Sequence, residues 1–448
     1  MKYPKRPPNA QEVVASTLTK DAKRLAVLLA HSSAIDQQGR YLHWDELRFK
    51  KSPPGDLTHE EWWATTRLSR HSASQMIGLV DTNGARFSFC DPAPLKEILR
   101  DLDMNAGGAL GSSETVLSTG EGKRYLARSL AEEPFQSSFI EGAATTRQIA
   151  KKLIFEGREP RTKDERMVLN NYRAMQFIKA HKDDDLTIPM LLELHKIVTD
   201  STMDDPADSG RFRTTDDVRV VDDTTNEVLH QPPPVAKLDA RLDRLMKFAN
   251  RKYDSSNWIH PLVRAMILHF LLSYEHPFVD GNGRVARALF YWLALKEGYW
   301  LIEYVSISAV IAESKIQYGQ AFLHTETDSA DLTYFLIYHA NILKTSLTRL
   351  AEFVERKRKE VRVLERRLGD RERPDSFNHR QSWLLNELAR NRLSSITVPD
   401  HLKQHGVSYL TARKDLEALV DAGCLEKKRW GKTVVYRPVR NLIKHLTT

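Results

Sequence analysis

The sequence predicts a mainly α-helical chain with small β elements at defined places. Between residues 111 and 350, apolar side chains recur at the three- and four-residue spacing of helices with one buried face. That stretch is interrupted by a single hairpin pattern near 218–229, and both ends of the chain mix strand-like runs with short helices. We therefore expect a central helical bundle with one β-hairpin, flanked by an N-terminal and a C-terminal module that combine helices and strands.

The length of the chain favours several domains. At 448 residues it exceeds the size of one hydrophobic core. We expect an N-terminal α+β region at 1–110, a helical domain at 111–350, a charged linker helix at 351–374 and a C-terminal domain at 375–448.

Composition limits the classes of protein to which the chain can belong. The hydrophobic share of 41% and the charged share of 28% are those of a soluble globular protein. The N-terminus lacks the apolar core of a signal peptide, and no uninterrupted apolar run reaches eighteen residues, so we expect neither secretion nor a membrane partner. The two cysteines, Cys90 and Cys424, are far apart in sequence, which fits a reducing, cytoplasmic setting and excludes a cysteine-rich zinc site.

The N-terminal region offers no evident site. The run at 86–89 has the pattern of a strand, and the tryptophans at 44, 62 and 63 are expected in a core. Further along, we expect helices near 123–133, 162–181, 187–199, 234–251, 257–275, 282–297, 306–325 and 330–350.

The most informative segment is the run from His276 to Arg287. A helix at 257–275 stops before Pro277, and helical spacing resumes at Asn282, which is a good N-cap residue. Gly281 and Gly283 flank that residue, so backbone N–H groups can converge there on an anion in front of the helix dipole. The sequence therefore predicts a phosphate cradle at the start of the second helix.

Charged and titratable residues surround this cradle. Asp280 at its lip can hold a Mg²⁺ ion that also takes phosphate oxygens. Arg284 and Arg287 are three residues apart in the helix, so both can pair with phosphate. His276, on the opposite lip, is placed to take a proton from a hydroxyl group.

The run resembles the signature of the Fic family, His-x-Phe-x-Asp/Glu-Gly-Asn-Gly-Arg-x-x-Arg, at every specified position. Members typically transfer AMP from ATP to a hydroxyl side chain of a protein. The resemblance implies that His276 is the general base and Asp280 the Mg²⁺ ligand. It further implies an anion hole and phosphate clamps formed by Gly281, Asn282, Gly283, Arg284 and Arg287, with Phe278 anchoring the loop in the core.

Two more segments resemble parts of Fic proteins. The hairpin, with Val218, Arg219 and Val220, corresponds to the flap over the active site, whose open edge could align a target segment by strand addition; a plain connector is the alternative. The opening run at 41–47 is similar to the N-terminal region of longer members.

Tyr318 is a candidate for the nucleotide base pocket, although helical tyrosines more often serve in packing.

An inhibitory motif is expected upstream. Ser137 and Glu141, followed by Gly142, match the family pattern Ser/Thr-x-x-x-Glu-Gly/Asn within a helix at about 134–145. The resemblance implies that Glu141 pairs with Arg287 and withholds it from the ATP γ-phosphate.

The C-terminal domain is predicted to be a winged helix-turn-helix. Helices are expected at 380–390, 398–405 and 408–422, then strands at 424–429 and 433–437 around a tip at 430–432. Residues 351–448 hold 22 basic against 13 acidic residues, whereas residues 1–350 hold 45 against 46, which indicates an anionic partner for this end. The candidate contacts with double-stranded DNA are Ser408, Tyr409, Thr411, Arg413, Lys414, Arg429 and Lys432; protein docking is the alternative use of such a domain.

Together these features predict a Mg²⁺-dependent protein adenylyltransferase that uses ATP and is inhibited by Glu141. Its target is a Ser, Thr or Tyr hydroxyl group of a protein, and the sequence leaves both self-modification and a homodimer open. Two alternatives share the same residues: a hydrolase that removes AMP with the help of Glu141, and a DNA-binding regulator whose Fic core senses nucleotide.

Overall fold

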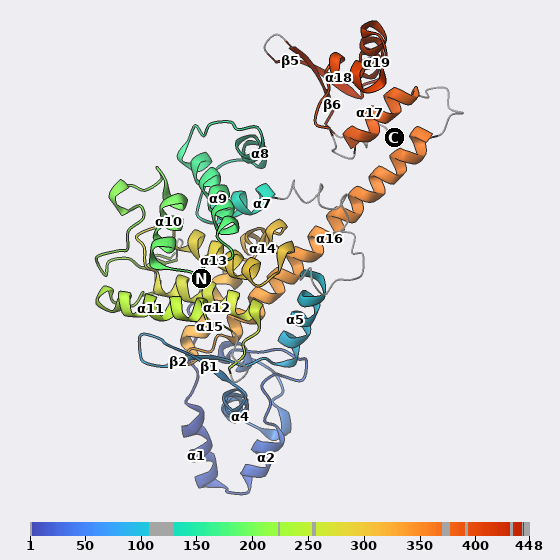
Figure 1. Ribbon diagram of the computed structural model, residues 1–448. Coiled ribbons are helices and arrows are strands. Elements are labelled where there is room, and N and C mark those ends of the chain that lie inside the picture. Colours follow the sequence, from blue (N-terminus) through green and yellow to red (C-terminus); the bar gives the residue numbers. More distant parts are fainter. Residues whose placement is uncertain are drawn as a thin grey trace. The chain divides into compact units, whose positions relative to one another are not determined.

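The computed structural model describes residues 2–106, 130–222, 225–252, 257–369, 377–389, 393–430, 433–440 and 442. It is mainly helical, with three two-stranded antiparallel sheets among these residues, which confirms the predicted class (Figure 1). The described residues up to 347 form one compact unit, and those from 348 onward belong to a second. In the part of the chain described, no helix is both long enough and apolar enough to cross a membrane.

The N-terminal region combines helices with one hairpin, as expected. Its elements are α1 (Ala10–Lys20), α2 (Arg24–Ala30), α3 (Trp44–Leu47), η1 (Pro54–Asp56), α4 (His59–Ser72), β1 (Gln75–Val80), β2 (Arg86–Phe89) and α5 (Ala93–Ala106). Trp44, Trp62 and Trp63 are buried in one hydrophobic cluster, so the tryptophan-rich patch is core. The predicted strand at 86–89 is β2.

Buried polar contacts join this region to the helical bundle of the same unit. The guanidinium of Arg70 donates to the Tyr334 hydroxyl at 2.7 Å and to the carbonyls of Ala34 and Leu42. Arg67 forms an ion pair with Asp328 at 3.1 Å. Because buried charges are retained only where they are paired, these contacts fix the N-terminal region against the bundle.

The bundle places two long helices at its centre. It consists of α7 (Glu132–Ile140), α8 (Arg147–Phe155), α9 (Lys163–Ala180), α10 (Ile188–Thr199), α11 (Leu238–Ala249), α12 (Pro261–Glu275), α13 (Asn282–Lys296), η5 (Trp300–Tyr304), α14 (Ile307–Glu313) and α15 (Lys315–Thr327). The short 3-10 turns η3 (Pro206–Asp208) and η4 (Val235–Lys237) flank the hairpin. Helices α12 and α13 pack against each other and are buried almost throughout, so the loop between them is held from both sides (Figure 1).

Several helix boundaries depart from the predictions. Helix α12 begins at Pro261, where proline suits the first helical position and His260 caps the free N–H of Leu262. The helix predicted at 306–325 is divided at Ser314, whose hydroxyl bonds the Val310 carbonyl and Tyr338. Helix α8 was not predicted, and the predicted segment at 123–133 lies mostly outside the described residues.

The predicted hairpin is present with a shorter first strand. Strand β3 (Val220–Val221) pairs with β4 (Val228–His230), and Val220 lies opposite His230. Val218 and Arg219 precede the first strand. Among the described strands, β3 pairs with β4 alone, so no described strand pairs with its other edge.

The second unit begins within a long helix. Helix α16 (Thr333–Gly369) is continuous through 37 residues, so the helices predicted at 330–350 and 351–374 are one element; the linker residues 371–374 lie outside the described part. It is followed by α17 (His379–Ala389), α18 (Val398–His405), α19 (Tyr409–Asp421), β5 (Leu425–Trp430) and β6 (Thr433–Pro438). A bridge from Ile396 to Tyr436 extends the small sheet.

Candidate active site

The loop between α12 and α13 has two residues in the left-handed conformation. His276 follows α12 at φ 45° and ψ 57°, and Gly281 precedes α13 at φ 84°. Glycine adopts this conformation at little cost, but histidine adopts it only where surrounding contacts hold the backbone. The loop therefore stores strain at the residue predicted to be the base.

Asn282 does not cap the helix, so its predicted role as N-cap is wrong. Gly281 occupies the cap position, and Asn282 is the first helical residue. The Asn282 side chain instead accepts from the Phe278 N–H at 2.9 Å and donates to the Phe278 carbonyl at 2.8 Å. It closes the loop because both polar groups of the buried Phe278 backbone need partners there.

A histidine that the sequence did not single out supports this loop. The buried His195 of α10 stacks on Phe278 with ring centroids 3.7 Å apart, and its Nε2 bonds the Asp280 carbonyl at 2.9 Å. Its Nδ1 accepts from the Gly210 N–H, so Nε2 carries the ring proton. Phe278 is fully buried, as expected of the loop anchor.

His276 has the tautomer and charge of a general base. Its Nδ1 lies 3.2 Å from the Ser273 carbonyl, which only accepts, so Nδ1 carries the proton and Nε2 keeps its lone pair. Burial lowers the pKa of His276 to about 4, against the opposing effect of that hydrogen bond. The ring is therefore neutral at neutral pH, and its Nε2 is able to take a proton.

Asp280 and Arg284 lie together at the edge of the cradle. The Asp280 carboxylate is 57% exposed, accepts from the Gly281 N–H at 2.6 Å and pairs with Arg284 at 3.0 Å. Arg284 also donates to the Val198 carbonyl, and its buried Nε has no hydrogen-bond partner. The exposed Asp280 carboxylate could hold a cation, and the unsatisfied N–H of Arg284 could donate to a phosphate oxygen.

Glu141 lies directly over the cradle. Its Oε1 is 2.8 Å from the Arg287 guanidinium, and a Cβ added to Gly283 would come within 2.5 Å of the same oxygen. Arg287 is almost fully buried and donates in addition to the hydroxyl and the carbonyl of Ser137. The two motif residues upstream and the last arginine of the signature are therefore in direct contact.

Glu141 is held in its charged form. Burial raises the pKa of its carboxyl, but the neighbouring Arg287 and Arg284 outweigh that effect, so the net pKa is lowered. At neutral pH a carboxylate thus occupies the place where the glycines and arginines favour an anion.

Helix α7 carries Ser137 and Glu141, and two buried anchors hold it. Glu133 accepts from the Ser306 hydroxyl and from the N–H and hydroxyl of Ser308, at 2.6 to 3.0 Å. On the other side, Asn171 of α9 donates to the Ser138 hydroxyl at 2.7 Å. The helix ends at Ile140, with Glu141 as its cap residue, rather than at about 145. Sequence reasoning missed both anchors.

The hairpin is attached to the loop through Arg213. This buried residue donates from its backbone N–H to the Pro277 carbonyl at 2.9 Å and from Nε to the His276 carbonyl at 3.0 Å. It also bonds the Pro233 carbonyl at the far end of the hairpin. In the hairpin, Val218 and Val220 are half-buried, and Arg219 is exposed.

Tyr318 lies behind the arginine clamp. Its hydroxyl is 2.9 Å from Nε2 of the buried His269, whose Nδ1 contacts His339 at 3.0 Å. Its ring packs against Phe322, so it belongs to a buried aromatic cluster and is only partly accessible.

The candidate DNA contacts lie in the second unit. Ser408 caps α19 and bonds the half-buried Thr411, while Tyr409, Arg413, Lys414 and Arg429 are exposed. Lys432 lies outside the described residues.

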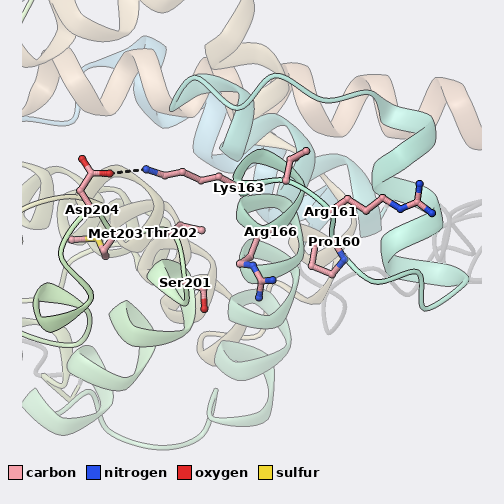
Figure 2. Close-up of a pocket in the computed structure, with 9 residues that line it drawn as sticks. Pro160, Arg161, Lys163, Arg166, Ser201, Thr202, Met203 and Asp204 are labelled. Carbon is pink, nitrogen blue, oxygen red and sulfur yellow. Dashed lines mark hydrogen bonds and ion pairs between the residues drawn. The ribbon is translucent and has the colours of Figure 1, made fainter.

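A separate hollow of about 450 Å³ lies where the start of α9 meets the loop after α10. Figure 2 shows Lys163 reaching across it to Asp204, with which it pairs at 3.0 Å. Its lining comes from 160–166 and 201–204 and includes no residue of the loop from His276 to Arg287, so it is not part of the candidate site.

Comparison with known proteins agrees with the motif. Residues 185–294 match the model of the Fic/DOC family, which confirms the resemblance drawn from the signature. The chain is 30% identical over 218 residues to the protein adenylyltransferase Fic of Drosophila willistoni, covering 45% of this chain and 40% of that protein. The corresponding protein of Drosophila melanogaster is 31% identical, with 45% and 41% covered. The chain spans about two fifths of the length of these relatives.

Solved structures of similar proteins include a Fic family protein from Desulfovibrio desulfuricans. Its TM-score is 0.49 at 19% identity, covering 78% of this chain and 96% of that one. Fic-1 from C. elegans gives 0.45 at 24% identity, covering 59% and 73%.

Proposed function

We propose, from the Fic/DOC domain at residues 185–294, that the chain transfers AMP from ATP to a hydroxyl side chain of a protein. The observation that carries the proposal is the loop itself. A neutral His276, with the lone pair of Nε2 available, stands at one end of a glycine-lined cradle flanked by Arg284 and Arg287. Transfer of a phosphoryl-type group needs mainly positioning and charge stabilisation, which such a loop supplies.

In the proposed reaction His276 takes the proton of the target hydroxyl at Nε2. The hydroxyl oxygen forms a bond to the α-phosphorus of ATP, and the bond to the bridging oxygen breaks, so that pyrophosphate leaves. The first N–H groups of α13, from Asn282 and Gly283, lack acceptors within the helix and face the phosphates. Arg284 and Arg287 hold phosphate oxygens, and Tyr318 borders the site behind Arg287.

Mg²⁺ is part of the proposal, with Asp280 as its protein ligand. In the described residues no group of three His, Cys, Asp or Glu side chains could hold a metal ion. A single exposed carboxylate fits Mg²⁺, which usually keeps its waters and shares phosphate oxygens. The ion would neutralise phosphate charge.

Glu141 is proposed to keep the transfer inactive. It pairs with Arg287 and lies over Gly283, so the γ-phosphate cannot reach that arginine while the carboxylate is in place. The hairpin is proposed to align the target, because the edge of β3 with which no described strand pairs can accept another strand.

The test is labelling with α-³²P-ATP and Mg²⁺ in a cell lysate. The Glu141→Gly protein should label itself or other proteins at least about tenfold more than the parent, as expected when a block of ~1.4 kcal/mol or more is removed. Adding His276→Ala should abolish the label. The matched control is Glu156→Gly, since Glu156 also follows a helix as its cap residue, at the end of α8.

Two outcomes would contradict the proposal. Absence of label from the Glu141→Gly protein would exclude AMP transfer, and equal labelling without His276 would exclude its role as base. Loss of AMP release from a modified protein on Glu141→Gly, without gain of transfer, would instead favour the hydrolase, with Glu141 orienting water.

For the C-terminal part we propose a winged helix-turn-helix that binds double-stranded DNA in the cytoplasm. Its support is the basic excess of residues 351–448 and the exposed side chains of Arg413 and Lys414 on α19.

A further inference from the structure

The hairpin is attached at both ends to the backbone around His276. Before β3, Arg213 bonds the carbonyls of His276 and Pro277. At the end of β4, Nε2 of His230 lies 2.7 Å from the Tyr274 carbonyl. Three carbonyls between Tyr274, in the last turn of α12, and Pro277 thus hold the hairpin, and one of these contacts depends on a histidine.

Both ring nitrogens of His230 face groups that accept hydrogen bonds. A carbonyl has no proton to give, so the nitrogen facing Tyr274 must donate. The other nitrogen, Nδ1, lies 2.8 Å from the Glu326 carboxylate of α15. Since an ionised carboxylate also only accepts, the geometry requires a proton on each nitrogen.

The surroundings of the buried His230 favour this charge. Burial lowers its pKa, but the Glu326 carboxylate and the Tyr274 carbonyl outweigh burial, so its net pKa is raised. Glu275, at the end of α12, adds a smaller attraction and is itself paired with Arg241. In return, His230 lowers the pKa of His276 in addition to the larger effect of burial.

We propose that His230 is a positioning residue whose doubly protonated ring clamps the hairpin to the end of α12, and that deprotonation releases the clamp. The proposal rests on the proposed function, because the hairpin aligns the target for His276. When His230 loses its proton, the lone pair of Nδ1 faces the Glu326 carboxylate, so that contact becomes repulsive and β4 loses one of its holds.

The pKa shifts of His230 and His276 determine how AMP transfer depends on pH. A raised pKa means that the clamp is complete below the ordinary histidine pKa and is lost as pH rises through the raised value. His276, with its pKa lowered to about 4, is a competent base above that value. Transfer should therefore rise near pH 4, stay level and fall again above pH 6.5.

The first test needs no activity. In the full-length protein labelled with ¹⁵N-histidine, His230 should show two ring N–H groups at pH 6.5 and titrate above that pH; His230→Gln assigns its signals. The half-buried His181, whose ring contacts Phe177 and pairs with Asp184, is the internal reference. A single protonated nitrogen in His230 at pH 6.5, or titration below that pH, would overturn the proposal.

The second test measures target and ATP kinetics in the Glu141→Gly background. Glu326→Gln replaces the acceptor with an amide that can donate to Nδ1, so neutral His230 then fits and the alkaline fall should disappear or move up by at least about one pH unit. His230→Gln should raise KM for the target about tenfold and leave KM for ATP within about twofold, a split that general destabilisation would not give.

An unchanged alkaline fall in Glu326→Gln would sink the proposal. If the Glu141→Gly protein transfers no AMP at all, the proposed function fails, and the ¹⁵N titration still decides whether His230 is the charged clamp.

Discussion

At the scale of single residues, Gly283 leaves no room for a side chain beside Glu141. The missing side chain matters because a Cβ would lie 2.5 Å from Glu141 Oε1 and 3.1 Å from the Arg287 guanidinium. The carboxylate is the flexible end of its side chain, so it would have to move away and leave the buried arginine without its partner. A glycine within a helix thus makes room for the inhibitory contact.

We expect Gly283→Ala to lower the free energy of unfolding of the parent by about 1–3 kcal/mol, because a buried Arg287 loses its charged partner. In the Glu141→Gly background the same change should be neutral or stabilising, since alanine is favoured over glycine in helices by about 0.5–1 kcal/mol. Urea unfolding of the four proteins measures the difference. Equal effects in both backgrounds would show that Gly283 and Glu141 are not coupled.

A substitution of Asn282 can distinguish a role as N-cap of α13 from a role as bridge across the loop. As an N-cap, asparagine and aspartate are nearly equivalent, so Asn282→Asp would cost little. As the bridge across the loop, Asn282 donates to the Phe278 carbonyl, which a carboxylate cannot do. We therefore expect Asn282→Asp to lower the free energy of unfolding by about 1–3 kcal/mol. A cost close to zero by urea unfolding would restore the capping role.

The sequence could predict the residues of the loop but not those that hold it. His276, Asp280 and the two arginines lie in one short run, and their chemistry is legible from residue types and spacing. His195 and Arg213 contact the loop, and His230 contacts the end of α12 just before it. These residues lie 46 to 81 positions before His276, and no local pattern marks them. His195 is a lone histidine on the apolar face of α10, and that position was the only hint of a role in the sequence of this helix. A buried histidine can equally be a packing residue, so the hint does not identify a contact with the loop.

At the scale of elements, the position of α7 decides whether Glu141 reaches Arg287. Two adjacent glutamates in the first turn of α7 make different contacts. Glu133 is buried and accepts three hydrogen bonds from α14 and its cap residue. Glu132 is one-third exposed and pairs with Arg147. Substitution of Glu133 therefore tests the anchoring of α7, and substitution of Glu132 is a control on the same helix.

We expect Glu133→Ala to loosen α7, because it leaves the N–H and hydroxyl of Ser308 without their acceptor. Hydrogen exchange of the amides of 132–141 should become at least about tenfold faster, the effect of ~1.4 kcal/mol of local stability. Glu132→Ala should change that exchange by less than about threefold. Equal acceleration by both substitutions would mean that Glu133 is not the anchor.

Helix periodicity predicted most of the bundle, and its failures have local causes. The helices α9, α10 and α13 carry long apolar faces and begin and end within a residue or two of the predictions. The break at Ser314 depends on a hydroxyl contact with Tyr338, twenty-four residues later, and is invisible to periodicity. Helix α8 buries only Ala150 and Leu153, too few positions to register as a stripe.

At the scale of the whole molecule, the basic excess lies in the second unit, which has a core of its own. Asp415 of α19 accepts from Arg380 at 2.6 Å and from Asn378 at 2.8 Å, and it lies 3.3 Å from His401 of α18. One buried carboxylate thus ties together α17, α18 and α19. With α19 fixed in this way, the proposed DNA contacts Arg413 and Lys414 project from a helix whose position is set by the core of the unit.

We expect Arg413→Ala with Lys414→Ala to reduce the affinity for a pool of random 30-base-pair duplexes at least about tenfold, and to lower the salt dependence of binding by about two counterions. The matched control is Lys151→Ala with Lys152→Ala, which removes the same charge from exposed positions on α8 in the first unit. Mobility shifts at several salt concentrations measure both.

Because His276 and its partners lie in the first unit, AMP transfer by the Glu141→Gly protein should be the same with and without the double substitution. An equal loss of affinity in the control would mean that DNA binding depends on net charge alone. The absence of any mobility shift in the parent would contradict DNA binding and favour protein docking as the role of this unit.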